Sequence, residues 1–275
     1  MALFYPENEK KELKDINDLM KRWKKEVSKS KVKYRDDGEY YTGDTWFSPD
    51  GFLPFYFSQH KKVLFVARED RQNWNTVKEW MKIFKEAKLP QKCFFVPLLK
   101  ILYGFQTDFT LEYKQVPNIN EIAKNIGKED GFSFAILELS KYGNSNEDSM
   151  TCDVNLMKSF FENSNLDVNN FFIEELSILN PDIIITNNIW ASKLSRIMKY
   201  IDKYVFYNDS IKEIKSNNNA VLYSISINGR IIPLIDTYHF SAIGKNAENI
   251  QTEKYFYNPI MKLVKSEKYR KIFIE

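Results

Sequence analysis

The chain is poor in the residues from which metal centres and disulfide frameworks are built. Its 275 residues include 2 cysteines and 2 histidines. Cys93 and Cys152 form no CxxC pattern, and two thiols cannot supply the four ligands of a structural zinc or iron-sulfur site. We therefore expect no metal and no cofactor, and a reducing cytoplasm is the simplest setting for the two thiols.

Long apolar runs and a strong charge imbalance are also missing. The hydrophobic stretches fall well short of the roughly 20 residues that cross a bilayer, and the first residues lack the apolar core of a signal peptide. The 40 basic and 37 acidic residues leave a net charge of +3, which is too small to decide for or against nucleic acid as a partner. We expect a soluble, cytoplasmic monomer that has no contact with membranes.

The chain does contain an alternation of strand-like and helix-like segments. Apolar runs typical of buried strands cover residues 62–66, 134–137, 183–186, 221–227 and 231–235. Helical spacing covers residues 150–162, 170–179, 191–201 and 255–267, and a further helix is expected from Thr76, where Thr76-x-x-Glu79 resembles a capping box. The alternation predicts an α/β fold with a mostly parallel sheet, and Asn228-Gly229 predicts a hairpin with one antiparallel edge strand.

Residues 1–45 are predicted to form an N-terminal extension packed on one domain over residues 46–275. Apolar residues at steps of three and four, from Leu13 through Trp23 to Val27, are typical of an amphipathic helix. The opposite face of that helix is rich in lysine and is either solvated or in contact with phosphates. An aromatic loop that contains Tyr41 and Trp46 follows the helix.

Polar residues that can perform chemistry follow two of the predicted strands directly. The strand over residues 62–66 leads to Glu69, and the strand over residues 231–235 leads to His239. Residues just past the carboxyl ends of parallel strands line one crevice, so we expect Glu69 and His239 to share a site. The alternatives are a surface turn in which Glu69 pairs with a neighbouring arginine, and a histidine whose ring is satisfied locally at the strand end.

Four segments, in this order, resemble motifs of the uracil-DNA glycosylase superfamily. They are Ala67-Arg68-Glu69, Glu138-Leu-Ser-Lys141, Leu179-Asn-Pro-Asp-Ile-Ile-Ile-Thr186 and His239-Phe-Ser241, and the likeness spans about residues 47–257. Ala67 stands where the family usually has glycine, and Phe240 stands where its His-Pro-Ser motif has proline. The resemblance implies a three-layer α/β/α fold and a monofunctional glycosylase. Such an enzyme flips a base out of double-stranded DNA and hydrolyses its N-glycosidic bond, which leaves an abasic site.

The resemblance also implies roles for individual residues. Breaking the N-glycosidic bond places positive charge on the sugar and negative charge on the departing base. Glu69 occupies the acidic position that positions water or stabilises the sugar cation, and His239 is expected to donate a hydrogen bond to the base. A flipped base also needs an aromatic stacking partner. The candidates for that ring are Trp74, Tyr41, Trp46 and Phe94.

Glu138 falls where the family commonly has the asparagine that reads uracil. A buried and protonated glutamate accepts from N4 of cytosine and donates to N3, so a cytosine-derived base is favoured. Removal of ordinary cytosine would destroy the host genome, so the target is expected to be a modified base such as those of phage DNA, and the role antiviral defence or repair. Alternatively, Glu138 pairs with Lys141, and Asn144 or Asn146 reads the base.

Phosphate contacts are predicted for four residues near these motifs, Ser241, Arg68, Lys141 and Lys245. Asn187 and Asn188 follow the strand over residues 183–186 and are predicted to cap the next helix rather than to contact substrate.

Two other functions fit parts of the sequence. Pro181-Asp182 and the later Glu213-Ile-Lys215 have the form of a PD-(D/E)xK nuclease motif, which binds Mg²⁺, although residues 213–215 are expected in a polar stretch before a strand. A DNA-binding module that keeps the fold but has lost the chemistry is the second alternative.

Overall fold

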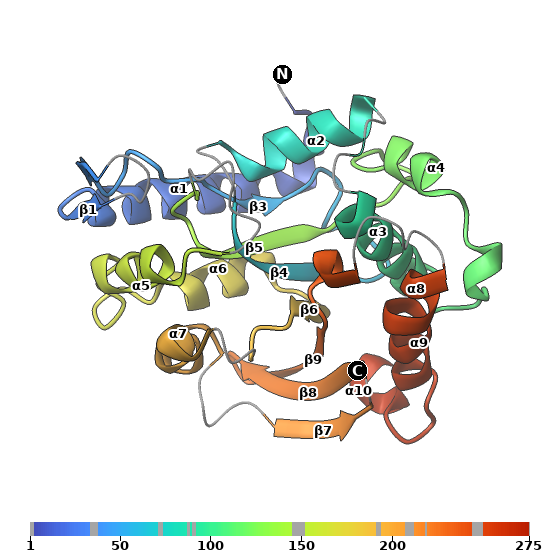
Figure 1. The fold of residues 1–275 in the computed structure, drawn as a ribbon. Coiled ribbons are helices and arrows are strands. Elements are labelled where there is room, and N and C mark those ends of the chain that lie inside the picture. The colour runs from blue at the N-terminus through green and yellow to red at the C-terminus, as the bar shows by residue number, and fades with distance from the viewer. Residues whose placement is uncertain are drawn as a thin grey trace.

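A seven-stranded sheet forms the centre of the molecule in the computed structural model, in the order β3-β5-β4-β6-β9-β8-β7 (Figure 1). The structure describes residues 3–33, 38–70, 74–86, 89, 92–144, 152–190, 194–206, 212–217, 219–243 and 250–274. The strands of this sheet are β3 (Gly51–Phe52), β4 (Val63–Glu69), β5 (Ala135–Ser140), β6 (Ile183–Asn187), β7 (Lys212–Ser216), β8 (Ala220–Ile227) and β9 (Arg230–Thr237). A separate hairpin pairs β1 (Lys31–Lys33) with β2 (Tyr40–Thr42).

The middle of the sheet is parallel and its edges are antiparallel. Strands β5, β4, β6 and β9 run in one direction, whereas β3, β8 and β7 each pair antiparallel with a neighbour. The α/β class and the parallel centre are confirmed, but the prediction of one antiparallel edge strand is wrong. Strand β3 has two residues and β7 is largely exposed, so neither shows the apolar run that marks a buried strand.

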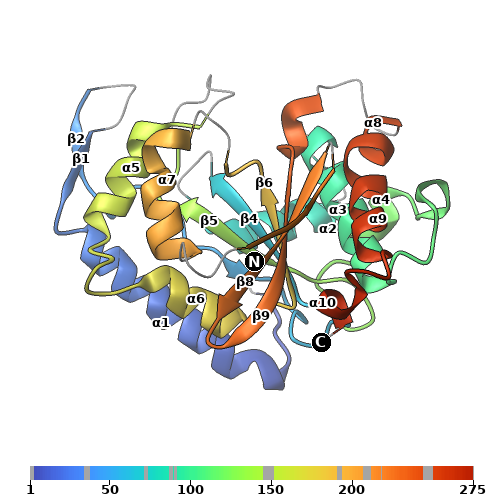
Figure 2. The same ribbon diagram turned by 90° about the horizontal axis from the view of Figure 1, so that it is seen from below.

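Helices cover both faces of the sheet (Figure 2). The α-helices are α1 (Lys10–Val27), α2 (Thr76–Glu86), α3 (Lys92–Gln106), α4 (Ile119–Lys124), α5 (Val154–Asn163), α6 (Phe171–Leu179), α7 (Ser195–Tyr200), α8 (Ile250–Thr252), α9 (Asn258–Val264) and α10 (Arg270–Ile274). Shorter or wider turns are η1 (Glu7–Glu9), η2 (Tyr113–Gln115), η4 (Ile201–Val205), η6 (Phe240–Ile243) and η7 (Glu253–Tyr257). One buried cluster contains residues of α1, α5 and α6, and a second contains residues of α2, α3 and α9.

Alternating residues of the central strands contribute to the two clusters. On β4, Leu64 and Val66 belong to the cluster with α1, whereas Val63 and Phe65 belong to the cluster with α3. Because both faces of the strand are covered, both sets of side chains are apolar, which explains the continuous apolar runs in the sequence. Beyond Val66 the strand continues with polar residues, and these lie at its carboxyl end.

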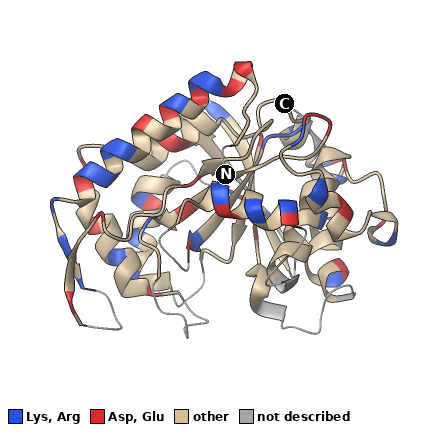
Figure 3. Ribbon diagram, turned by 90° about the horizontal axis from the view of Figure 1, so that it is seen from above, with Lys and Arg blue, Asp and Glu red and all other residues tan. Residues whose placement is uncertain are grey.

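The N-terminal helix α1 is part of the core. Trp23 is fully buried, with its ring centroid 5.1 Å from that of Phe171 and 5.2 Å from that of Phe160, and its indole Nε1 donates to Ser164 Oγ at 2.8 Å. The outer face of α1 mixes basic and acidic residues (Figure 3). Lys11, Lys14 and Lys21 form ion pairs with Asp15 and Asp18 of the same helix, as is common on a solvated helix face.

One local prediction, at the start of α2, is wrong, and no prediction from the sequence covers α3. Asn75, not Thr76, caps α2, because Asn75 Oδ1 accepts from the backbone N–H of Lys78 at 2.9 Å while the Thr76 hydroxyl donates to Asp70. Helix α3 was not predicted, because it contains Pro97, and proline normally ends a helical pattern. Among the described residues, no helix combines the length and the apolar character that crossing a membrane requires.

Candidate active site

Four neighbouring strands end at one edge of the sheet, and each carries a polar residue there. Glu69 ends β4, Glu138 lies near the end of β5, Asn187 ends β6, and His239 follows β9. The order β5-β4-β6-β9 places β6 between the strands that lead to Glu69 and His239. The predicted placement of these two residues at one edge of a parallel sheet is therefore confirmed.

The Glu69 carboxylate is held by one oxygen and leaves the other unused. Its Oε1 accepts from Asn144 Nδ2 at 3.0 Å and from the backbone N–H of Asp153 at 2.8 Å. Its Oε2 is buried and makes no hydrogen bond with any described residue. Burial raises the pKa of Glu69 to about 7, and the two hydrogen bonds act in the opposite direction. Glu69 is thus a fixed carboxyl group that titrates near neutral pH, not the acid of a surface turn.

Arg68 has little contact with solvent, whereas a phosphate ligand needs an accessible side chain. Its side chain is buried, and Nη2 donates to the backbone carbonyls of Asn188 at 3.0 Å and Asn187 at 3.4 Å. The prediction that Arg68 binds phosphate is therefore wrong, because its guanidinium joins the end of β4 to the end of β6.

His239 is oriented by Ser241. The ring atom Nδ1 lies 3.3 Å from the backbone nitrogen of Ser241, which donates to it, and 2.7 Å from Ser241 Oγ. A ring nitrogen that accepts an N–H carries no proton, so in the neutral ring the proton is on Nε2. His239 can therefore present an N–H donor to a substrate. Ser241 is half-buried beside it.

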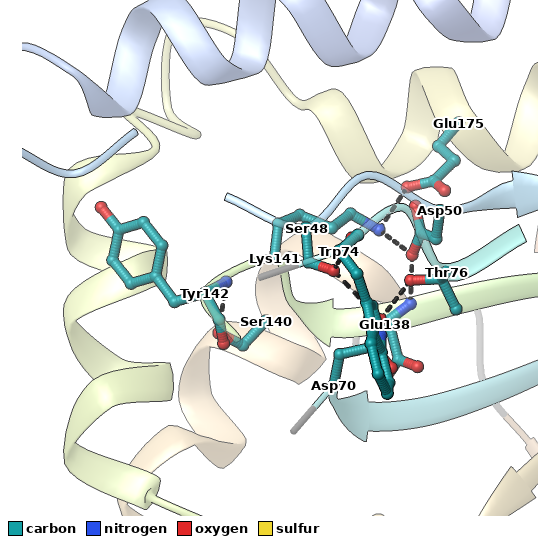
Figure 4. Close-up of polar contacts among 10 residues, drawn as sticks. All are labelled: Ser48, Asp50, Asp70, Trp74, Thr76, Glu138, Ser140, Lys141, Tyr142 and Glu175. Carbon is teal, nitrogen blue, oxygen red and sulfur yellow. Dashed lines mark hydrogen bonds and ion pairs between the residues drawn. The ribbon is translucent and has the colours of Figure 1, made fainter. Parts of the chain in front are cut away.

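The candidate stacking rings occupy different parts of the molecule. Phe94, on α3, has its ring centroid 6.1 Å from that of His239 and is half-buried. The ring centroids of Tyr41 and Trp46 are 6.3 Å apart, and both residues pack against the cluster on the other face of the sheet. Trp74 lies near Asp70 in the polar cluster of Figure 4. Phe94 is thus the predicted ring that the structure brings next to His239.

A buried ionic cluster lies behind the end of β5 (Figure 4). Lys141 is fully buried, and its ammonium forms ion pairs with Asp50 and, at 3.0 Å, with Glu175. The prediction that Lys141 contacts phosphate is wrong, because no part of its side chain reaches solvent. The alternative pairing of Lys141 with Glu138 is not formed either, since the ammonium donates to the carboxylates of Asp50 and Glu175 instead.

Glu138 is buried among other acids. Its backbone N–H donates to Asp50 Oδ2 at 2.5 Å, and its side-chain Oε2 has no hydrogen-bond partner among the described residues. Burial, followed by the nearby charges of Asp70 and Asp50, raises the pKa of Glu138 well above its usual value. Burial also raises the pKa of Asp70 to about 6, although Thr76 and Ser48 donate to it. The environment of Glu138 thus favours its protonated form, in which a carboxyl group both donates and accepts.

Several participants in this cluster were not found from the sequence. Asp50, Asp70 and Glu175 carry no motif, and only the fold brings them together around Lys141 and Glu138. A sequence signal existed for Asp70 alone, since it follows Glu69 directly after a buried strand.

The remaining predictions concern asparagines and a lysine near the ends of the strands. Asn187 lies inside β6, and α7 begins at Ser195 with no side-chain cap, so the predicted capping by Asn187 or Asn188 is wrong. Asn144 binds Glu69. Lys245 and Asn146 lie outside the described residues.

The residues of the predicted nuclease motif do not lie close together in the structure. Asp182 precedes β6 at the opposite edge of the sheet, where it pairs with Arg230 at 2.5 Å and accepts from the backbone N–H of Lys62 at 2.9 Å. Glu213 lies on strand β7, contrary to the expectation of a polar stretch before a strand, and β7 is three strands from β6. Three strand spacings amount to about 14 Å, which is too far for a shared cation. The described residues contain no group of three His, Cys, Asp or Glu suited to a metal ion.

Comparison of the chain with protein-family models, with curated proteins and with solved structures finds no match in any of the three.

Proposed function

We propose that this chain is a monofunctional DNA glycosylase with a three-layer α/β/α fold of the uracil-DNA glycosylase type. The observation that carries the proposal is the pair of Glu69 and His239 at the carboxyl ends of β4 and β9, together with the Oε2 atom of Glu69, which makes no hydrogen bond with any described residue. Each side chain is also fixed by hydrogen bonds, so the site is organised before a substrate arrives.

The chemistry follows from these two groups. The N-glycosidic bond breaks, and its electron pair leaves with the base, which accepts a hydrogen bond from His239 Nε2–H. The ionised Glu69 stabilises the positive sugar and orients a water, whose oxygen bonds to the anomeric carbon, and the proton that this water loses neutralises the departing base. The products are the free base and an abasic site, and the reaction requires no covalent enzyme intermediate.

The base is proposed to be derived from cytosine. Burial raises the pKa of Glu138, and in its protonated form this side chain offers a donor and an acceptor that match N3 and N4 of that base. Cleavage of ordinary cytosine would be lethal, so the proposed substrate is DNA with a modified cytosine, as in phage genomes, and the proposed role is antiviral defence. Uracil is the second proposed substrate, in which case the role is repair.

The test is to incubate the protein, in EDTA, with three DNAs that contain uracil, unmodified cytosine or hypermodified cytosine, and then to cleave abasic sites with alkali. We expect strand breaks in one of the two substrate DNAs and loss of these breaks in Glu69→Gln and His239→Ala. A matched control is His60→Ala, since His60 is the only other histidine and is exposed, paired with Asp108.

Other outcomes would replace the proposal. Cutting that needs Mg²⁺ and is lost in Asp182→Asn would indicate a nuclease. Absence of abasic sites on all three DNAs, together with DNA binding that Glu69→Gln and His239→Ala leave unchanged, would indicate a binding module without chemistry.

A further inference from the structure

Asn187 is a buried amide at the end of β6, and neither the capping prediction nor the proposed chemistry gives its side chain a role. Its exposed fraction is 1%, and its Oδ1 makes no hydrogen bond with any described residue. A buried carbonyl oxygen without a partner is uncommon in folded proteins, because the missing bond costs stability. Such an oxygen at the carboxyl end of a central strand points to a ligand that supplies the missing donor.

The register of the sheet aligns Asn187 with Glu138 across β4. Ala67 pairs with Glu138, and the pairing of Val66 with Thr186 places the next residues, Ala67 and Asn187, side by side. Residues paired in this way project from the same face of a sheet. The face is the one that packs against α2 and α3, because Phe65, two residues before Ala67, lies in the cluster with those helices. This is also the face on which Phe94 lies.

The residue between these two side chains is less buried than they are. Ala67 is partly exposed although it lies on a central strand, whereas Glu138 and Asn187 on either side are 2% and 1% exposed. Part of Ala67 therefore contacts solvent. The flanking side chains each have an oxygen without a partner among the described residues, Oε2 of Glu138 and Oδ1 of Asn187.

The spacing fixes the size of the group that fits between them. Two strand spacings separate β5 from β6 by about 10 Å, and side chains stand roughly perpendicular to a sheet. A hydrogen bond of about 2.9 Å on each side leaves a width of about 4 Å for the bound group itself. This width matches a single six-membered ring and not a purine.

We propose that Asn187 is a specificity-determining residue that binds one edge of a flipped pyrimidine base while Glu138 binds another, over the methyl group of Ala67. This inference rests on the proposed function, which supplies the flipped base. The amide of Asn187 offers both a donor and an acceptor, so it distinguishes bases that present opposite patterns at that edge.

The test compares Asn187→Ala with the wild-type protein and with Asn120→Ala, a control at an exposed position on α4. Two quantities are measured, kcat/KM on the cleaved DNA and on its closest competitor, and the affinity for free uracil, cytosine and 5-hydroxymethylcytosine by calorimetry. We expect Asn187→Ala to lower kcat/KM about 10- to 100-fold and to bring the rates on the two DNAs closer together. Asn120→Ala should change neither quantity. The isosteric Asn187→Asp replaces Asn187→Ala if the latter does not fold.

The two measurements separate this inference from the proposed function. If the wild-type protein cleaves DNA and Asn187→Ala keeps both rates within twofold, the role of Asn187 is wrong and the glycosylase proposal stands. If the wild-type protein cleaves no DNA but binds one of the free bases, and Asn187→Ala loses that binding, the recognition role stands without the reaction. The inference is overturned if the wild-type protein and Asn187→Ala bind the free bases equally well. It is also overturned if the wild-type protein neither cleaves DNA nor binds any of the free bases.

Discussion

Burial determines the protonation of the acidic residues at the carboxyl edge of the sheet. The pKa of Glu69 is about 7, because its removal from water disfavours the charged form more strongly than its two hydrogen bonds favour it. Asp70, one residue later, has a pKa of about 6 for the same reason. Burial and the nearby charges of Asp70 and Asp50 raise the pKa of Glu138 well above its usual value. Carboxyl groups at one edge of the sheet thus differ in how readily they ionise.

Glu69 gives a prediction for the pH dependence of the reaction. The proposed chemistry needs the ionised form, so kcat/KM should rise with pH, reach half of its plateau near pH 7, and be about tenfold below the plateau at pH 6. Initial rates of abasic-site formation between pH 5.5 and 9 measure this. A profile that is flat, or that falls as pH rises through 7, contradicts a role for the Glu69 anion.

At the scale of secondary-structure elements, a single lysine joins three segments. Lys141 follows β5, Asp50 immediately precedes β3, and Glu175 lies on α6, so the ion pairs fix both elements against the end of β5. The ammonium also lies 5.2 Å from the centroid of the Trp23 ring on α1. The position of β5, and with it Glu138, depends on this buried charge.

Removal of that charge should destabilise the protein strongly. Lys141→Ala leaves two carboxylates buried without their cation, and we expect a loss of about 3–5 kcal/mol in the free energy of unfolding. Lys158→Ala is the matched control, because Lys158 pairs with Glu162 in a largely exposed position and should cost less than about 1 kcal/mol. Urea denaturation of both variants measures the difference. Similar losses for the two lysines would show that the buried pairs contribute little.

Sequence analysis predicts the elements whose burial leaves a clear pattern of apolar residues. Strands β4, β6 and β9 are apolar on both faces, so their runs are visible, and their carboxyl ends locate Glu69 and His239. Helix α3 is also apolar, but it lacks a polar stripe and contains Pro97, so its pattern does not identify it. The missed helix carries Phe94.

Tertiary contacts explain the site residues that sequence analysis assigned wrongly. Lys141 and Arg68 are charged, and charged side chains are normally exposed, so phosphate binding was a reasonable expectation for both. Their partners are Glu175 and the backbone of residues 187 and 188, which are remote in sequence. Asn187 was assigned to a helix cap, because the end of β6 could not be fixed without the register of its neighbours.

At the scale of the whole molecule, the N-terminal segment is inseparable from the rest. Glu9 accepts from the backbone N–H groups of Phe55 and Phe57, each at 2.8 Å, and Trp23 fills the space between α5 and α6. A chain that begins at residue 46 would lose all of these contacts and expose the apolar faces that they cover.

We therefore predict that residues 46–275, expressed alone, show no cooperative thermal unfolding. Full-length protein should show one transition, and circular dichroism measures both. A truncated chain whose transition temperature lies within a few degrees of that of the full-length protein would mean that α1 is an accessory element. The substitution Trp23→Ala in the full chain tests the same contacts less drastically and should cost about 3–5 kcal/mol.

The position of β9 has a consequence for the order of events during synthesis. This strand lies between β6 and β8 inside the sheet, yet residues 230–237 are synthesised after every other strand of that sheet. Until they emerge, β6 lacks a neighbour on one side, and the histidine after β9 does not exist. Since a sheet that lacks an interior strand cannot close its core, a prematurely terminated chain has neither a stable fold nor a complete site. The fold and the candidate site are therefore completed together, when the last strand of the sheet is in place.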